Sequence, residues 1–428
     1  MSGDQAGFHH GSHRKLLWSS PFHHPLPGNG IDAIIVPTTR GPDNLLNAMR
    51  LAVELDCVLV TLHSKHDKSA TEAALMLPAD IDLLAIDIAS SVSYRMPHWE
   101  TSQLLANSPF IRPTDLSLKR NIGIMLSRMA NWSCVLFLDD DIGFPADKGE
   151  PGGPAAEQDP DSEERAVKAA AKKVAEAVEL LETHNAVALQ VGGFPDHSVV
   201  CHAYLSSGGD QETFVGGGAM VLAVARSRSF FPDIYNDDWF FLLNGDNRLQ
   251  PVATVSRGGQ KPGVVEQLEF DPFRSPSRAC SEELGEVLAE GLYWLLDQDQ
   301  PLTQATEGYW KWFLELRRQF IGRVLEMTRA SGLEESGRRR RVRALNSSLE
   351  QLARIRPEFC RKYLEAWERD RTLWQRHLDH GFLRPAEWSE IPGHLTEPGQ
   401  PSLTWYVRRK SAGRGFGSGG CLLSAGRA

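Results

Sequence analysis

Acidic residues gather at two places in this sequence where carboxylates could do chemistry. Asp139, Asp140 and Asp141 directly follow the apolar run CVLFL, and Asp237 and Asp238 precede the aromatic run WFF. Like charges held side by side raise one another's pKa and weaken folding, so a compensating positive charge is expected beside the first group. Hard carboxylate oxygens suit Mg²⁺ or Mn²⁺, which can in turn hold a diphosphate. The pattern predicts a metal at Asp139 and Asp141; an acidic turn that caps the next segment is the alternative.

The composition is that of a globular protein without a strong attraction to polyanions. The 428 residues carry a formal net charge of −9, with 41% apolar and 24% charged residues. Because nucleic-acid binding rests mainly on neutralising phosphates, this charge argues against a nucleic-acid partner. One basic run, Arg338 to Arg341 with Arg343, indicates either a solvated helix face or a site for an anionic partner or membrane surface.

Apolar runs do not reach the length of a membrane helix, which needs roughly 18 such residues, and the N-terminal residues lack the apolar stretch of a signal peptide. The six cysteines are scattered without CxxC spacing, which argues against a disulfide framework or a zinc site. We therefore expect a cytoplasmic protein with no membrane span.

The elements that must position these acids are predicted by apolar periodicity over residues 30–299. Short apolar runs alternate with helical segments, which predicts an α/β domain with a mostly parallel sheet, whose ligands collect at the carboxyl ends of strands. The expected strands are IDAIIVPTT, CVLVTLHS, LLAIDI, CVLFL, AVALQVGGF, SVVCHAYL and GAMVLAV. Leu118, Ile122 and Met125 form one apolar helix face directly before the first acidic group.

Three further segments have a different character. Residues 1–29 and 386–428 are expected to be irregular, disordered tails, and 148–161 a flexible surface loop, because they are rich in Gly, Ser, Pro or polar residues. Residues 300–385 are expected to form a helical appendage. Aromatic and apolar stripes at helical spacing, expected to be core or else ligand-stacking surfaces, are Tyr309, Phe313, Leu316, Phe320, Val324 and Met327, and Tyr363, Trp367, Trp374 and Leu378. The appendage either shapes an acceptor site or forms a homodimer; the sequence leaves both open.

The order of four motifs along the chain resembles that of glycosyltransferases with the GT-A fold. The motifs are VPTTRGPDNL after the first strand, KRNIG before FLDDDI, then VGGGAM, then NDDWFF. Over about residues 30–295 the chain is similar to family 2-like members and, more distantly, to bacterial glucosyl-phosphoglycerate synthases. The resemblance implies a Rossmann-like nucleotide-diphospho-sugar transferase, with a mixed, mostly parallel sheet flanked by helices and a C-terminal helical appendage. It would transfer a sugar from a nucleotide-diphosphate sugar to a hydroxyl acceptor.

The resemblance also implies roles for individual residues. Asp139 and Asp141 would coordinate the metal, and Asp140 would lie near the ribose or sugar. Either Asp237 or Asp238, with Asp238 preferred, would act as the general base; two acids that complement a helix N-terminus are the alternative. The residues expected to bind donor or acceptor are Pro37, Thr38, Arg40, Asp87, Lys119, Arg120, Asn121, Asp140 and the loop Gly216, Gly217 and Gly218. An exposed helix charge at Arg120 and a tight turn at the glycines are the alternatives.

The sequence departs from the family pattern at the third metal ligand. Many relatives supply a downstream histidine, but none occurs between residues 203 and 376. The candidate replacements are His197, His202, Glu266, Gln267, Glu269 and Asp271. The stereochemical outcome of transfer therefore stays open. Two other functions also stay open: a nucleotidyltransferase, which would usually carry a GxGxR-type loop that TTRGPDNL lacks, and a non-catalytic nucleotide-sugar-binding or scaffold protein.

Overall fold

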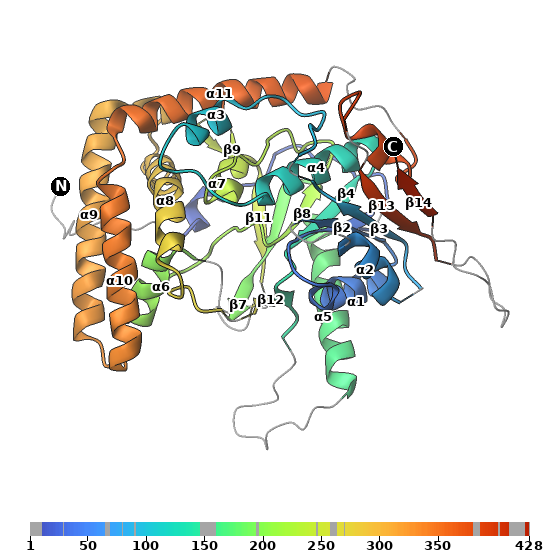
Figure 1. The fold of residues 1–428 in the computed structure, drawn as a ribbon, viewed down its shortest axis with the longest axis horizontal. Helices are drawn as coiled ribbons and strands as arrows, with labels where there is room; N and C mark the ends of the chain where they lie inside the picture. Colours follow the sequence, from blue (N-terminus) through green and yellow to red (C-terminus); the bar gives the residue numbers. More distant parts are fainter. Residues whose placement is uncertain are drawn as a thin grey trace.

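Within the part of the chain that the structure describes, nine strands form one central sheet (Figure 1). This computed structural model describes residues 11–28, 30–64, 69–78, 80–89, 91–145, 160–193, 197–244, 247–256, 263–268, 270–379, 386–400, 403–410 and 424–427. The strands, in their order across the sheet, are β11 (Val252–Val255), β6 (Ala186–Leu189), β8 (Ala219–Ala223), β4 (Cys134–Leu138), β1 (Ala33–Thr38), β2 (Val58–His63), β3 (Leu83–Asp87), β13 (Thr404–Arg408) and β14 (Ser424–Arg427). β8 and β13 run opposite to the other strands.

The sheet is buried on both faces. Successive residues of a strand point to opposite faces, and in these strands most residues of both sets are apolar. All six residues of β1 are buried. Ile34 and Val36 pack into one hydrophobic cluster, whereas Ala33 and Ile35 pack into the other. The predicted α/β architecture, with a large, mostly parallel sheet flanked by helices, is thereby confirmed.

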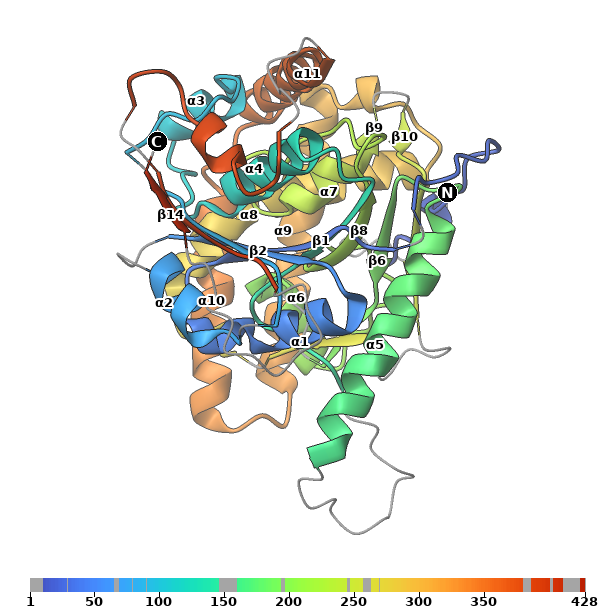
Figure 2. The same ribbon diagram turned by 90° about the vertical axis from the view of Figure 1, so that its right-hand side faces the viewer.

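Helices cover the two faces of the sheet in separate groups (Figure 2). One face is covered by α1 (Leu46–Leu55), α2 (Ser69–Met76) and α5 (Pro160–Leu180). On the other face lie α4 (Leu116–Met129), which packs on β1, and α7 (Asp237–Leu242). None of the described helices has the length and apolar character needed to cross a membrane.

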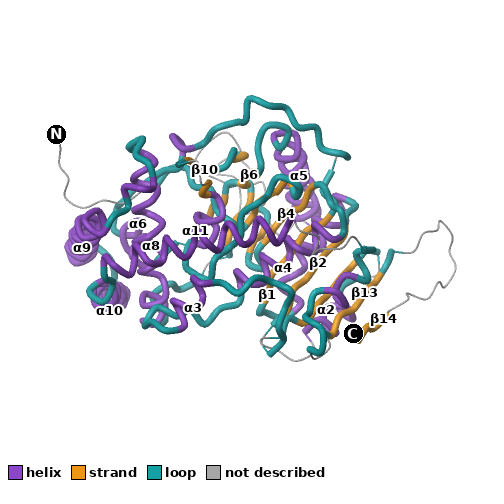
Figure 3. Tube along the Cα trace, turned by 90° about the horizontal axis from the view of Figure 1, so that it is seen from above, coloured by secondary structure: helices purple, strands orange, loops and turns teal. Residues whose placement is uncertain are grey.

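A layer of long helices adjoins the face that carries α4 and α7. It consists of α8 (Pro276–Asp297), α9 (Glu307–Ala330), α10 (Glu335–Leu352) and α11 (Pro357–Asp379), with the short α3 (Glu100–Ala106) and α6 (Val199–Ser206). α9 and α10 stand at one end of the molecule, and β13 and β14 lie at the other (Figure 3). Phe313, Phe320, Tyr363, Trp367 and Trp374 are buried. The interpretation of the aromatic stripes as core is confirmed for these residues.

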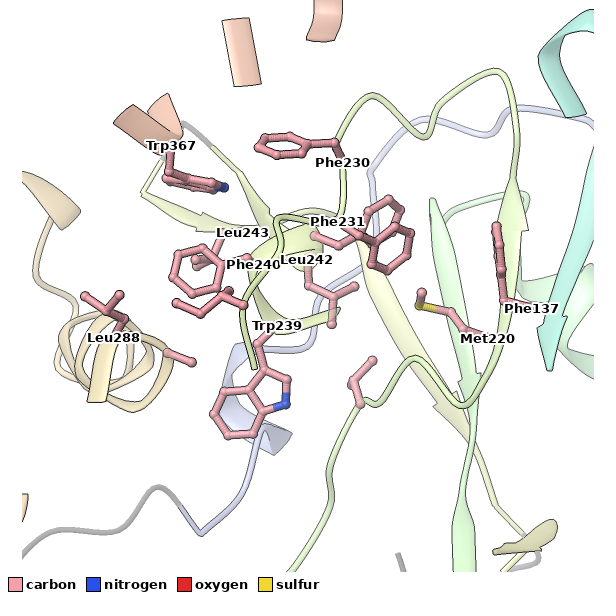
Figure 4. Packing of buried hydrophobic residues seen from close by; sticks show 14 of the residues in the cluster. Phe137, Met220, Phe230, Phe231, Trp239, Phe240, Leu242, Leu243, Leu288 and Trp367 are labelled. Atoms are coloured by element: carbon pink, nitrogen blue, oxygen red, sulfur yellow. The ribbon is translucent and has the colours of Figure 1, made fainter. Parts of the chain in front are cut away.

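Helix α7 packs between the sheet and the helical layer (Figure 4). Phe240 belongs to the same hydrophobic cluster as Phe137 of β4, Met220 of β8 and Leu288 of α8. Its ring lies 5.5 Å from that of Trp367 of α11, in an edge-on arrangement. Because α7 begins with the second acidic group, the helical layer and the sheet together decide where that group lies.

The apolar run SVVCHAYL, predicted as a strand, is instead helix α6. Ser198 precedes the helix, and its hydroxyl accepts a hydrogen bond from the backbone N–H of Cys201 at 3.3 Å. A serine in this position satisfies an N–H that the first helical turn leaves without a partner. The strand prediction was wrong because a short apolar run has the same pattern in a buried helix.

Segments expected to be disordered tails are folded where the structure describes them. Among residues 11–28, the buried His13 accepts a hydrogen bond at Nδ1 from the backbone N–H of Val215 at 3.0 Å. Trp18 Nε1 donates to the carbonyl of Leu249 at 2.8 Å. In the C-terminal segment, β13 pairs with β3. Residues 1–10, 146–159 and 411–423, on which the same predictions partly fell, lie outside the described residues.

Smaller elements complete the fold. A second sheet holds β5 (Ile142–Gly143), β12 (Val265–Gln267) and β7 (Val191–Gly193), and a third pairs β9 (Leu243–Asn244) with β10 (Arg248–Leu249). Short 3-10 turns occur at Arg14–Leu16, Pro42–Leu45, Leu302–Gln304 and Ile391–His394. The second sheet matters for the site because β5 and β12 pair directly after the first acidic group.

Candidate functional site

The first acidic group lies where the strand order of the sheet reverses. β1, β2 and β3 follow one another outward on one side, and β4 returns to pair with β1 on the other. Asp139 to Asp141 follow β4, and Thr38 ends β1, so their loops meet at this point. In open α/β sheets, ligands bind outside the carboxyl ends of the strands where the order reverses. The acids thus occupy the position in the fold where a ligand is expected.

Thr38 and Arg40 reach the acids from the loop after β1. Thr38 Oγ1 donates to Asp140 Oδ2 at 2.6 Å. The Arg40 guanidinium pairs with Asp140 and, at 3.1 Å between Nη2 and Oδ2, with Asp141. Because 45% of the Arg40 side chain is exposed, water screens these ion pairs and they hold weakly. An incoming anion can therefore compete for this guanidinium.

Arg120 of α4 is the buried counterion that joins the two acidic groups. Its Nη2 lies 3.2 and 3.1 Å from the two carboxylate oxygens of Asp139, and its Nη1 lies 3.0 Å from Oδ1 of Asp237. Only 4% of the Arg120 side chain is exposed. Burial lowers the pKa of Arg120, but the charges of Asp139 and Asp237 outweigh it, so the pKa is raised. The guanidinium stays charged and fixes both carboxylates.

Lys119 supplies a second buried positive charge beside the first acidic group. Its Nζ donates to the carbonyl of Thr38 and to Ser64 Oγ, both at 2.7 Å, and pairs with Asp115 at 3.0 Å. Only 1% of the Lys119 side chain is exposed. These contacts tie α4 to the ends of β1 and β2 and leave a fixed charge in the wall of the site.

A cavity of about 160 Å³ opens among these side chains. Sites for drug-sized ligands usually occupy about 300–1,000 Å³, so this cavity is large enough only for a part of such a ligand. Predicted site residues that line it are Pro37, Thr38, Arg40, Lys119, Asp139, Asp140, Asp141 and Gln267. Thr114 and Asp115, which the sequence did not indicate, also line it.

Burial disfavours the ionised forms of the carboxylates in the first acidic group. It raises the pKa of Asp139 to about 7, although the charge of Arg120 opposes the rise. Burial also raises the pKa of Asp140, against the hydrogen bond from Thr38 and the charge of Arg40. A further cation placed beside these carboxylates would lower both pKa values and favour the ionised forms.

The glycine loop before β8 lies against the second acidic group. The backbone N–H of Gly217 donates to Asp238 Oδ2 at 2.7 Å. A Cβ atom on Gly217 would lie 2.9 Å from Asp238 Cβ and 3.1 Å from Arg120 Cζ, so only glycine allows this approach. A Cβ on Gly218 would lie 3.3 Å from Asp139 Oδ2. The loop therefore contacts both acidic groups.

The two acids of the second group are used differently. Asp237 is 4% exposed and accepts hydrogen bonds from Ser117 Oγ at 2.8 Å, from Arg120 and from the backbone N–H of Asp238. Asp238 is partly exposed, and burial, with the neighbouring charge of Asp237, raises its pKa to about 6. A partly exposed carboxylate with that pKa can accept a proton near neutral pH, so the geometry favours Asp238 as a base and Asp237 as an anchor.

Two residues expected to bind the donor form hydrogen bonds with the backbone and lie outside the cavity lining. Asp87 accepts a hydrogen bond at Oδ1 from the backbone N–H of Ala70 at 3.0 Å, at the start of α2. Asn121 is buried, donates to the carbonyl of Phe231 at 2.8 Å and accepts from the N–H of Phe231 at 2.9 Å. Neither residue lines the 160 Å³ cavity.

A metal ion would have to use oxygen atoms of the first acidic group. Gln267 Nε2 lies 3.3 Å from Asp141 Oδ2, and rotation of the amide would present its oxygen instead. Mg²⁺ often takes only one or two carboxylates and completes its shell with water and substrate phosphates, which the donor chemistry of Asp139 and Asp141 fits. Across the described residues, no group of three or more His, Cys, Asp or Glu side chains is arranged as a metal site.

The other candidates for a third ligand make different contacts. Asp271 pairs with Arg340 at 2.9 Å on the surface. Burial lowers the pKa of His202 to about 2. Of the described candidates Glu266, Gln267, Asp271, His197 and His202, Gln267 alone lines the cavity, and Glu269 lies outside the described residues.

The basic run lies along α10, where much of its charge is paired within the chain. Arg338 and Arg339 pair with Glu335, and Arg341 Nε donates to Ser206 Oγ at 3.0 Å. A surface hollow of about 350 Å³ is lined by Arg338, Arg339 and Arg343 of the run, together with Arg329, Val342 and Asn346. These pairs favour the solvated-face interpretation.

No protein-family model matches this chain, and no curated protein matches it significantly.

Proposed function

We propose that this chain is a glycosyltransferase that moves a sugar from a nucleotide-diphosphate sugar to a hydroxyl acceptor, on a GT-A type of fold. The observation that carries the proposal is the arrangement of two acidic groups, Asp139 to Asp141 and Asp238, around Arg120 and Gly217 at the end of β4. The first group suits a diphosphate with its cation, and the second suits a proton acceptor.

The donor's diphosphate would bind in the cavity at the end of β4. Arg40 is half exposed and can exchange its carboxylate partners for phosphate oxygens in a two-pronged contact. Lys119 adds a fixed positive charge to the same wall. Mg²⁺ or Mn²⁺, held by Asp139 and Asp141, would supply Lewis-acid charge for the departing nucleoside diphosphate.

Asp238 would take the proton of the acceptor hydroxyl. Its carboxylate is held by the N–H groups of Gly217 and Trp239, at 2.7 and 2.9 Å, and is partly exposed. The acceptor oxygen forms a bond to the anomeric carbon while the bond from that carbon to the diphosphate breaks, and the proton moves to Asp238. The pKa of Asp238 is about 6, so the ionised carboxylate needed for this step prevails at pH values above about 6.

A non-catalytic nucleotide-sugar-binding protein is the second candidate. The observation in its favour is that arginines already pair with all three acids of the first group. Such a protein would bind a nucleotide and neither hydrolyse nor transfer its sugar. Both proposals include a cytoplasmic location. The five cysteines that the structure describes form no disulfide.

Calorimetric titration with nucleoside diphosphates and nucleotide sugars tests the proposal, with Mg²⁺, with Mn²⁺ and with EDTA. We expect one nucleotide to bind in a metal-dependent way, Asp141→Ala to weaken it at least about tenfold, and Asp238→Asn to bind it normally while losing transfer. Binding without turnover by the wild type would favour the second candidate. No nucleotide binding under any metal condition would overturn both.

A further inference from the structure

The helical layer carries a buried ionic cluster of three glutamates around one arginine. Glu283, Glu286 and Glu290 of α8 surround Arg317 of α9. The guanidinium nitrogens lie 2.8, 3.2 and 3.1 Å from the nearest oxygens of the three acids. No side chain in the cluster is more than 8% exposed. Buried ion networks often add little stability over apolar packing, and in some proteins they instead fix one particular arrangement of the chain.

One acid of the cluster, Glu286, contacts both Arg317 and the loop before α7. Glu286 Oε1 accepts a hydrogen bond from Asn236 Nδ2 at 3.0 Å, while Glu286 Oε2 pairs with Arg317. Asn236 has φ 62° and ψ 34°, in the left-handed region that asparagine tolerates better than most residues. It directly precedes Asp237 and Asp238. The cluster therefore contacts Asn236, the residue directly before α7.

The backbone beside Asn236 is held by α8 at the same point. A Cβ atom on Gly285 would lie 2.1 Å from the carbonyl oxygen of Tyr235, so α8 touches the main chain directly there. α7 has only six residues, too few for a helix to be stable without tertiary contacts. α8 and its cluster thus contact the chain directly before α7 at two points.

We propose that Glu286 and Arg317 are positioning residues: through Asn236 they hold the start of α7, and so place the Asp238 carboxylate against Gly217 at the acceptor side of the site. This inference rests on the proposed function for its catalytic meaning. The placement of the carboxylate can be tested without turnover.

Two variants separate the contact from the backbone conformation. Asn236→Gly keeps the left-handed conformation at no steric cost and removes the contact with Glu286. Glu286→Gln keeps the size of the side chain and an oxygen for Asn236 but removes the charge that pairs with Arg317. Arg318→Gln is the matched control, since Arg318 is the next residue of α9 and 58% of its side chain is exposed.

Hydrogen–deuterium exchange of the segment 214–220 is the first readout, because it contains the Gly217 amide that donates to Asp238 and none of the substitutions. We expect at least about tenfold faster exchange in Asn236→Gly and Glu286→Gln and no change in Arg318→Gln. We also expect sugar transfer to fall about tenfold or more with the nucleotide Kd unchanged, because small misplacements of a catalytic group are costly.

Unchanged exchange at 214–220 in folded variants would overturn the positioning inference, whatever the activity. Faster exchange in a protein whose wild type transfers no sugar would support the placement and overturn the proposed function. An equal effect in Arg318→Gln would also overturn the inference, because it would show a general loosening of α9.

Discussion

Gly217 and Gly216 are neighbours in one loop but have very different surroundings. A Cβ on Gly217 would lie 2.9 Å from Asp238 Cβ, whereas the nearest atom to a Cβ on Gly216 is Asp238 Oδ2 at 3.7 Å, an ordinary contact. We expect Gly217→Ala to lower the free energy of unfolding by about 1–3 kcal/mol through overpacking. Gly216→Ala should change it by less than about 0.5 kcal/mol. Urea unfolding of the two variants measures the difference, and equal losses would contradict the close approach.

Asp238 gives the proposed reaction a definite pH dependence. Burial and the charge of Asp237 raise the pKa of Asp238 to about 6, and a general base acts in its ionised form. Transfer at low substrate concentration should therefore rise as pH increases through about 6 and level off above it. In Asp238→Asn the rate should be very low and this rise absent. Persistence of the same rise in Asp238→Asn would assign the pKa to another group.

The sequence predicted where the acids lie better than it predicted the neighbouring helix. Asp139 to Asp141 were placed correctly because residues that follow a buried parallel strand come to one edge of the sheet. Lys119, Arg120 and Asn121 were expected to face the donor together. Successive residues of a helix point about 100° apart, so three in a row cannot share a target. Lys119 contacts the end of β1, and Arg120 contacts Asp139. Asn121 forms a hydrogen bond with the backbone of Phe231.

The residues that sequence reasoning missed carry weaker signals. Ser64 follows β2 at the same edge of the sheet as the acids, so the strand-end rule could have indicated it. Ser117 precedes Arg120 by three residues on α4 and shares its helix face, and both contact Asp237. Serine is common at such positions, and its contact with Asp237, 120 residues away, appears only after folding.

At the scale of elements, a side chain of α11 caps the N-terminus of α3, although the two helices are far apart in the sequence. Asp370 is 1% exposed and accepts hydrogen bonds from the N–H groups of Glu100 and Thr101 at 2.8 and 2.9 Å, and from Thr101 Oγ1 at 2.7 Å. A carboxylate at a helix N-terminus satisfies N–H groups that the helix itself cannot. This cap comes from another helix, so no local capping motif could reveal it.

We expect Asp370→Ala to lower the free energy of unfolding by about 1–3 kcal/mol, because it leaves buried N–H groups without acceptors. Asp370→Asn retains one acceptor oxygen and should lose less. Glu368→Ala, on an exposed part of the same helix, is the control. Denaturant unfolding with hydrogen exchange over residues 100–106 measures both effects, and an equal loss in the control would refute the capping role.

The whole molecule places its candidate site where three layers meet. The strand order reverses between β1 and β4, and the first turns of α1 and α4, one on each face, contact the chain at that point. α7 connects this region to the helical layer. Apolar patterning predicted the layers, because alternation and helical periodicity are local properties. It could not predict that β13, about 320 residues after β3, would pair beside it, because such pairing is decided by the edge left open after the other strands associate.

β13 should therefore be essential to the sheet although it lies near the end of the chain. It pairs along the whole of β3, and Arg408, which is 3% exposed, donates from Nη1 to the carbonyls of Ala74 and Leu77 at 3.0 and 2.7 Å, at the end of α2. A chain ending at residue 400 would expose the backbone edge of β3 and leave these carbonyls without their donor. We expect it to have a lower Tm and to self-associate, whereas a chain ending at Lys410 should keep β13, its Arg408 contacts and a Tm closer to that of the full chain. Thermal unfolding followed together with light scattering compares the two, and a monomeric chain ending at residue 400 with an unchanged Tm would show that the sheet does not depend on β13.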